Sequence, residues 1–138
     1  MKSSTVIDAQ GGGVGKMLVR LVRAALPQAQ IIAVGTNALA TSAMLRAGAD
    51  VGATGENAVA VGCKNAQVLL APIGLAFADS MYGEITAKMS LAFAKSQAKK
   101  ILVPMKQCGV VIAGMPDWPL AQFLEDAVAK AVLAAKEE

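Results

Sequence analysis

Apolar residues along the chain follow two spacings, short continuous runs and longer stretches with helical periodicity. Short apolar runs that end in Gly, Pro or Asp are typical of strands buried on both faces of a parallel sheet. These runs predict strands at residues 5–8, 31–34, 67–71, 101–103 and 110–113. Apolar residues three and four apart predict helices at residues 16–26, 39–47, 56–63, 85–96 and 120–135.

Strands that alternate with helices predict a three-layer α/β sandwich of about five strands with a mostly parallel sheet. Roughly six residues separate the last two predicted strands, too few for a helical crossover, so the last strand is expected to be antiparallel. The small residues 52–55 predict a loop, and Thr54 is expected to cap the helix after it.

The loops that follow the first three predicted strands are where we expect a ligand. Right-handed crossovers bring these loops to the same edge of a parallel sheet. Ligands of such folds bind at this carboxyl edge, at the point where the strand order reverses. The most glycine-rich part of the chain lies there.

The loop after the first strand reads Asp8-Ala9-Gln10-Gly11-Gly12-Gly13-Val14-Gly15-Lys16. Glycine lets the backbone approach a phosphate, and a helix N-terminus offers unpaired N–H groups. We therefore predict a nucleotide site here, and a purely structural turn is the alternative. The predicted binding residues of this loop are Asp8, Gln10, Gly11, Gly12, Gly13, Val14 and Gly15.

Two phosphate-binding motifs compete for this loop, and neither is complete. Gly11 and Gly13 fit the first half of the dinucleotide motif G-x-G-x-x-G, but Lys16 replaces its last glycine. A P-loop needs Ser or Thr after the lysine to hold Mg²⁺, and this chain has Met17 there. NAD or NADP is the predicted cofactor, with ATP or AMP as the alternative.

The second loop supplies neutral polar groups, Thr36 and Asn37, where NAD-binding domains usually have a carboxylate for the ribose. Short neutral groups tolerate a 2′-phosphate better, which favours NADP or a mononucleotide. Capping of the second helix is the alternative role for these two residues.

The third loop supplies Pro72 and Gly74 as predicted cofactor-binding residues, and Gly74 is expected to line the far side of the cleft with Asp79 and Glu84. Farther along, Asp79 and Glu84 are the candidate acid–base groups of a catalytic site. Glu84 fits equally well in the first turn of the fourth helix, where the helix dipole favours an acidic residue.

Composition excludes several function classes. The 138 residues contain no histidine, which excludes Ser-His-Asp triads and His-ligated zinc, and no metal site is predicted. Hydrophobic residues make up 55% of the chain and charged residues 17%, which predicts one folded domain over residues 1–138. The charge of +3 comes from scattered basic residues, and aromatic residues are only 4%, which argues against nucleic-acid binding.

The chain shows no targeting or membrane signal. The N-terminus lacks the apolar region of a signal peptide, and the longest apolar stretch, residues 68–78, is short and interrupted by Pro72 and Gly74. Cys63 and Cys108 are isolated and are expected to be reduced packing residues. A soluble cytoplasmic protein is therefore expected.

Several segments resemble a family of small bacterial Rossmann-like proteins described only as a domain of unknown function. They are residues 7–15, 33–44, 48–50, 52–58, 72–74 and 78–86. The resemblance covers nearly the whole chain. It implies a stand-alone Rossmann-like domain from a bacterium, and it implies no activity and no catalytic residues.

The prediction that joins these observations is a Rossmann-like protein that binds a small-molecule nucleotide at the glycine-rich loop. A chain of this length has no second substrate domain, so an active site would be completed by another copy in a homo-oligomer. The alternative is a non-enzymatic sensor or accessory subunit whose nucleotide controls its assembly.

Overall fold

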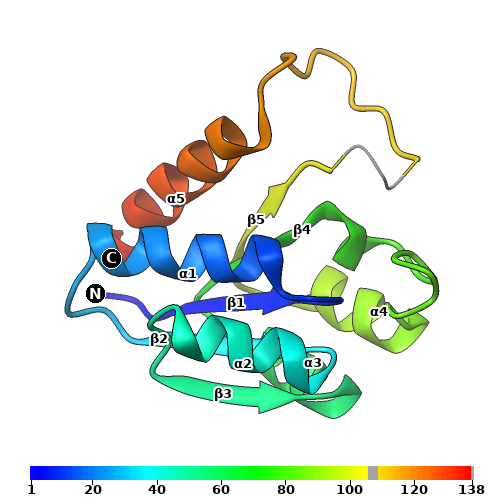
Figure 1. Cartoon of the computed structure of the whole chain (residues 1–138), viewed down its shortest axis with the longest axis horizontal. Coiled ribbons are helices and arrows are strands. Elements are labelled where there is room, and N and C mark those ends of the chain that lie inside the picture. Colours follow the sequence, from blue (N-terminus) through cyan, green and yellow to red (C-terminus); the bar gives the residue numbers. More distant parts are fainter. Residues whose placement is uncertain (106–108, 138) are drawn as a thin grey trace.

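A parallel sheet with helices on both faces forms the centre of the computed structural model, which describes residues 1–105 and 109–137 (Figure 1). The strand order within this part of the chain is β3-β2-β1-β4-β5. The strands are β1 (Ser4–Asp8), β2 (Ile31–Gly35), β3 (Val51–Thr54), β4 (Val68–Pro72) and β5 (Lys99–Val103). The helices are α1 (Gly13–Ala25), α2 (Ala38–Arg46), α3 (Glu56–Asn65), η1 (Ile73–Ala76, a short 3-10 helix), α4 (Ala87–Lys95) and α5 (Leu120–Lys136). The predicted α/β sandwich is confirmed.

Two apolar cores lie on opposite faces of the sheet. Helices α1, α2 and α5 cover one face, where Leu18, Met44 and Ala131 are buried. Helices α3 and α4 cover the other face, where Val59 and Phe93 are buried. Strands β1 and β4 contribute to both cores, which explains their continuous apolar runs.

The predicted loop at residues 52–55 is wrong for most of its length, because residues 51–54 form the edge strand β3. This strand pairs in parallel with β2, and all four of its residues are exposed. Thr54 does not cap α3, whose N-cap is Gly55 without a side-chain hydrogen bond. The Thr54 hydroxyl lies instead 2.7 Å from the Thr41 hydroxyl of α2, and this contact joins the strand to the helix above it.

The predicted antiparallel last strand is also wrong. β5 pairs in parallel with β4, and residues 110–113 lie outside the sheet. These residues belong to the connection between β5 and α5, and the Val111 side chain is 93% exposed. The β-branched residues of this segment favour a strand locally, but tertiary pairing decides whether one forms.

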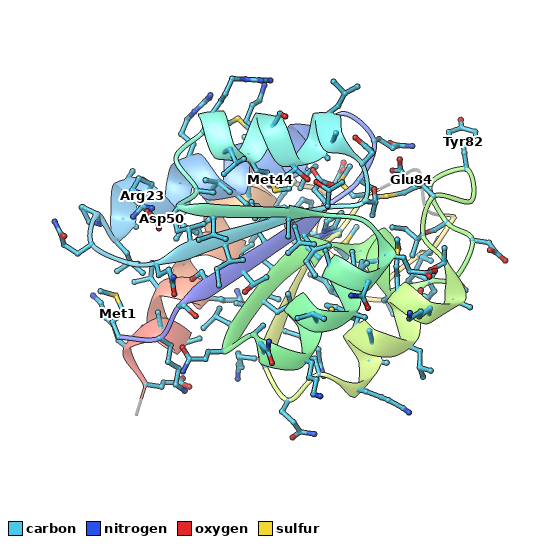
Figure 2. All side chains as sticks on the ribbon, turned by 90° about the horizontal axis from the view of Figure 1, so that it is seen from below. Met1, Arg23, Met44, Asp50, Tyr82 and Glu84 are labelled. Atoms are coloured by element: carbon cyan, nitrogen blue, oxygen red, sulfur yellow. The ribbon has the colours of Figure 1, made fainter. Side chains whose placement is uncertain are left out.

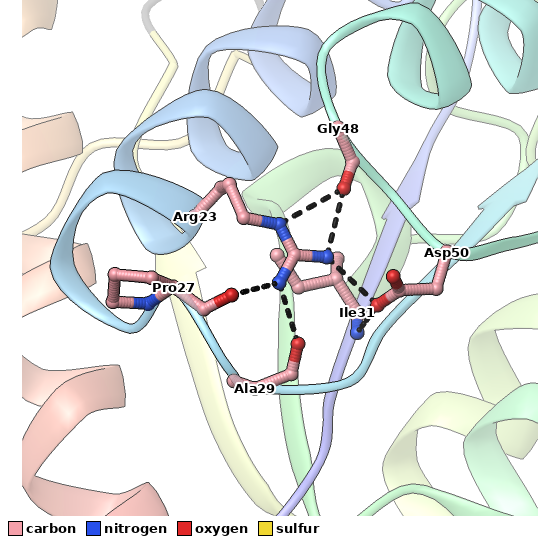
Figure 3. Close-up of polar contacts among 6 residues, drawn as sticks. All are labelled: Arg23, Pro27, Ala29, Ile31, Gly48 and Asp50. Atoms are coloured by element: carbon pink, nitrogen blue, oxygen red, sulfur yellow. Dashed lines mark hydrogen bonds and ion pairs between the residues drawn. The ribbon is translucent and has the colours of Figure 1, made fainter.

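Loops at the amino edge of the sheet converge on one arginine (Figure 3). The Arg23 guanidinium donates hydrogen bonds to the carbonyl oxygens of Pro27, Ala29 and Gly48. It also pairs with the Asp50 carboxylate at 2.7 Å, and this carboxylate accepts the Ile31 N–H at 2.8 Å. One side chain therefore satisfies acceptors from two loops that enter the sheet.

We expect Arg23→Met to lower the free energy of unfolding by about 2 to 3 kcal/mol, because partly buried carbonyl oxygens lose a charged donor. Arg20→Met is the matched control, since Arg20 lies on the same helix and is exposed. Its guanidinium makes only a long contact to the Met17 sulfur within the part of the chain that the structure describes. Urea denaturation of both variants measures the difference. Equal losses for the two variants would contradict the role assigned to Arg23.

The two ends of the chain meet at this same amino edge. The Lys2 N–H donates to the Ala135 carbonyl oxygen at 2.9 Å, and Figure 1 shows both ends beside the start of β1. Among the described residues, no helix is both long enough and apolar enough to cross a membrane.

Cys63 lies in the core, and burial raises the pKa of its thiol to about 11. This placement confirms its interpretation as a packing residue. The prediction for Cys108 falls outside the described residues.

Candidate functional site: the glycine-rich loop at the carboxyl edge

The glycine-rich loop lies where the strand order reverses. The chain moves outward from β1 to β2 and β3, and then returns to place β4 on the other side of β1. Helix α1 begins at Gly13, three residues before its predicted start at Lys16. The last glycines of the motif therefore form the first turn of a helix rather than a loop before it.

Asp8 ends β1 and lies beneath the loop. Its buried carboxylate accepts the Ala9 N–H at 2.8 Å and the Gly15 N–H at 2.6 Å. Burial raises the pKa of Asp8 to about 6, although these hydrogen bonds act in the opposite direction. A carboxylate in this position holds the start of α1 against the end of β1.

The glycines of the loop divide into packed and open positions. A methyl group on Gly12 would lie 2.8 Å from the Ala40 Cα atom, and one on Gly15 would lie 2.7 Å from the Asp8 Cβ atom. Methyl groups on Gly11 and Gly13 would meet no protein atom within 4 Å. Close packing therefore explains Gly12 and Gly15 but not Gly11 and Gly13.

The first turn of α1 also contains two unused donors. The Gly15 N–H bonds to Asp8, and the Gly12 N–H bonds to the Ala9 carbonyl oxygen. Among the described residues, the N–H groups of Gly13 and Val14 have no acceptor, as expected for the first turn of a helix. Open space and unused donors coincide at Gly13.

The loop after β2 lies beside the glycine-rich loop. The Thr36 N–H donates to the Asp8 carbonyl oxygen at 3.0 Å, and the buried Thr36 hydroxyl has no partner within the described residues. Asn37 caps α2 by accepting the Ala40 N–H at 3.0 Å, which confirms the capping role considered for it. Its amide nitrogen also donates to the Gln10 carbonyl oxygen at 2.9 Å, so the two loops are directly joined.

Glu84 reaches the same point from the segment between β4 and α4. One carboxylate oxygen accepts the Asn37 side-chain N–H at 2.9 Å, and the other accepts the Gln10 backbone N–H. Glu84 does not lie in the first turn of α4, because Thr86 is the N-cap of this helix. The alternative interpretation of Glu84 as a helix-start residue is therefore wrong.

Three predicted site residues are not joined to this cluster. Asp79 is exposed, and within the described part of the chain no hydrogen bond or ion pair connects its carboxylate to the glycine-rich loop. Gly74 is buried in η1 and packs on the Ser80 and Met81 side chains, so the chain itself fills the space beside it. Pro72 ends β4 and is also buried.

Residues 79–83 have an unusual backbone. Asp79, Met81 and Tyr82 have φ angles of 66°, 55° and 58°, and Gly83 follows at 84°. Left-handed backbone in a residue other than glycine costs of the order of 1 to 3 kcal/mol and persists only where surrounding contacts impose it. Tyr82 is fully exposed at the tip (Figure 2). Aspartate tolerates left-handed backbone better than most residues, but Met81 and Tyr82 give no sign of it in the sequence.

The Glu84 cluster and the Arg23–Asp50 pair lie at opposite ends of the sheet (Figure 2). A separate groove of about 600 Å³ lies between β5 and α5 and includes Trp118. The centroid of the Trp118 ring lies 5.2 Å from the centroid of the Phe123 ring. None of the predicted site residues lines this groove.

The fold and this site define a Rossmann-like α/β protein with a glycine-rich loop at the topological switch point. The family model described as a domain of unknown function (DUF3842) matches residues 3–136, and the chain belongs to this family. Among curated proteins, none has a matching sequence.

The solved structures that are similar to the chain include the following two. One is a dodecameric FMN-dependent UbiX-like decarboxylase from Escherichia coli O157:H7, at 14% identity and a TM-score of 0.48, over 98% of this chain and 96% of that one. The other is AibC, at 20% identity and a TM-score of 0.47, over 100% of this chain and 42% of that one. At these identities and TM-scores, neither structure assigns a ligand to this chain.

Proposed function

We propose that the protein binds a small-molecule nucleotide, with a phosphate at the first turn of α1. The observation that carries the proposal is the coincidence of open space and unused N–H donors at Gly13. A backbone without side chains at a helix N-terminus accommodates an anion closely, and the helix dipole favours its charge. Within this proposal, Gly13 and Val14 donate to the phosphate and Thr36 lies toward the ribose.

A dinucleotide, NAD or NADP, is favoured over ATP. The position that holds Mg²⁺ in a P-loop is Met17, a thioether that packs on the apolar core beneath α1. ATP and AMP are the alternatives in the same site. If the protein is an enzyme, Glu84 is the acid–base candidate next to the loop, and a sensor that changes assembly with its nucleotide is the non-enzymatic alternative.

Thermal unfolding with a panel of nucleotides tests the proposal. The panel contains NAD, NADP, their reduced forms, FMN, AMP, and ATP with and without Mg²⁺. A ligand at about 100 times its dissociation constant adds roughly 2.7 kcal/mol, which raises the Tm of a protein of this size by several degrees. No shift with any nucleotide, from protein shown to be ligand-free, would contradict the proposal.

Gly13→Val is expected to fold, because a Cβ atom at this position meets no protein atom within 4 Å, and to lose this shift, because the side chain occupies the open space. Ala24→Val is the control, since it also places a valine side chain on α1, at an exposed position near the other end of the helix. If a folded Gly13→Val variant kept the full shift, the ligand would have to bind elsewhere than at this loop.

A further inference from the structure

The Glu84 carboxylate is bound by the glycine-rich loop in the same way that an anionic ligand would be. One oxygen accepts the backbone N–H of Gln10, which lies in the loop just before the open glycines. The other oxygen accepts the side-chain N–H of Asn37. A single negative charge therefore already lies at the edge of the proposed phosphate site.

The contact also helps to hold the strained segment in place. Glu84 directly follows Gly83, at the end of the run of left-handed residues described above. On the other side, the segment is held by the Asp79 N–H, which donates to the Ile85 carbonyl oxygen at 2.7 Å, and by the Ser80 hydroxyl, which donates to the Gly74 carbonyl oxygen. The Glu84 carboxylate joins this segment to the glycine-rich loop at Gln10 and to the loop after β2 at Asn37.

A phosphate next to Gln10 and a carboxylate on the Gln10 N–H repel each other, and they compete for donors of the same loop. We propose that Glu84 is an internal carboxylate ligand of the glycine-rich loop, which a phosphate-bearing ligand displaces, so that residues 79–83 are released on binding. This inference rests on the proposed function, and it adds that ligand binding is coupled to movement of the exposed segment around Tyr82.

Tyr82 is the only tyrosine of the chain, so 3-fluorotyrosine gives a single ¹⁹F resonance at the tip of the segment. The titrant is inorganic pyrophosphate, with affinity measured by calorimetry at low salt. We expect E84Q to bind pyrophosphate about tenfold more tightly than the unmodified protein, because the competing charge is gone. We also expect its ¹⁹F shift without pyrophosphate to lie close to that of the saturated unmodified protein.

D79N is the matched control. It removes one negative charge from the same segment, but within the described residues no hydrogen bond or ion pair joins the Asp79 carboxylate to the loop. The pyrophosphate affinity of D79N is therefore expected to change less than twofold. E84A is the second variant and is expected to behave like E84Q. Equal or weaker binding by both Glu84 variants, or a Tyr82 resonance that does not move on saturation, would overturn the inference.

The outcomes separate this inference from the function on which it rests. If the unmodified protein and both Glu84 variants all fail to bind pyrophosphate and every nucleotide of the panel, the proposed function fails and this inference falls with it. If Gly13→Val loses nucleotide binding while the Glu84 variants bind as the unmodified protein does, only the displacement of Glu84 is overturned.

Discussion

Gly15→Ala is expected to lower the free energy of unfolding by about 3 kcal/mol, at the upper end of the usual cost of overpacking. The added methyl group would lie 2.6 Å from the Met44 sulfur and 2.7 Å from the Asp8 Cβ atom. The Met44 side chain can move, but the Asp8 Cβ atom is fixed by β1. Relief of the contact therefore separates α1 from β1 and weakens the hydrogen bond between Asp8 and the Gly15 N–H.

Gly13→Ala is the matched control for this prediction. Gly13 lies two residues earlier in the same helix turn, and its methyl group would meet nothing within 4 Å. Alanine also favours a helix over glycine by up to about 1 kcal/mol, so a neutral or slightly stabilising change is expected. Urea denaturation of both variants measures the contrast. Similar stabilities for the two variants would show that the packed and open glycines are not distinct.

Asp8→Asn is expected to remove a pH dependence of stability that amounts to about 3 kcal/mol. The pKa of Asp8 is raised from 3.8 to about 6 in the folded protein, mainly by burial. The folded state therefore binds this proton more tightly than the unfolded state does, and ionisation opposes folding. The penalty is absent below pH 3.8, grows between pH 3.8 and about 6, and is fully present at pH 7.

The measurement is the difference in free energy of unfolding between the Asp8→Asn variant and the unmodified protein, taken from pH 3.5 to pH 7. We expect this difference to shift in favour of the variant as pH rises. Asp50→Asn is the control with the opposite sign, because the Ile31 N–H and Arg23 lower the pKa of Asp50. The stabilisation from Asp50 is present above its ordinary pKa and is lost as pH falls. A difference for Asp8→Asn that does not change with pH would show that burial does not raise the pKa of Asp8.

The order of strands and helices could be predicted from the sequence because each buried element carries its own pattern. β4 has a continuous apolar run and α1 has helical periodicity, and both were predicted to within a few residues. β3 could not be predicted in this way, because its small residues carry no apolar pattern and it forms through pairing with β2. The prediction for residues 110–113 was wrong for the opposite reason. Their side chains favour a strand locally, but the segment pairs with no strand of the sheet.

The sequence placed the loops after β1 and β2 at the carboxyl edge of the sheet, where the structure has them, but did not show how they meet. The convergence of Gln10, Asn37 and Glu84 depends on crossover geometry and on a segment with left-handed backbone. The distinction between packed and open glycines also depends on which atoms lie next to each Cα atom. The sequence of the loop does not contain this information.

The meeting of the chain ends at the amino edge has a practical consequence for experiments on the carboxyl edge. Because Lys2 bonds to Ala135 beside the start of β1, a fluorescent fusion or a surface tether at either end extends away from the glycine-rich loop. A short linker between the two ends would also close the chain into a ring. New ends could then be opened in the exposed connection around Gly114, so that circular permutants can be made with the strand order of the sheet unchanged.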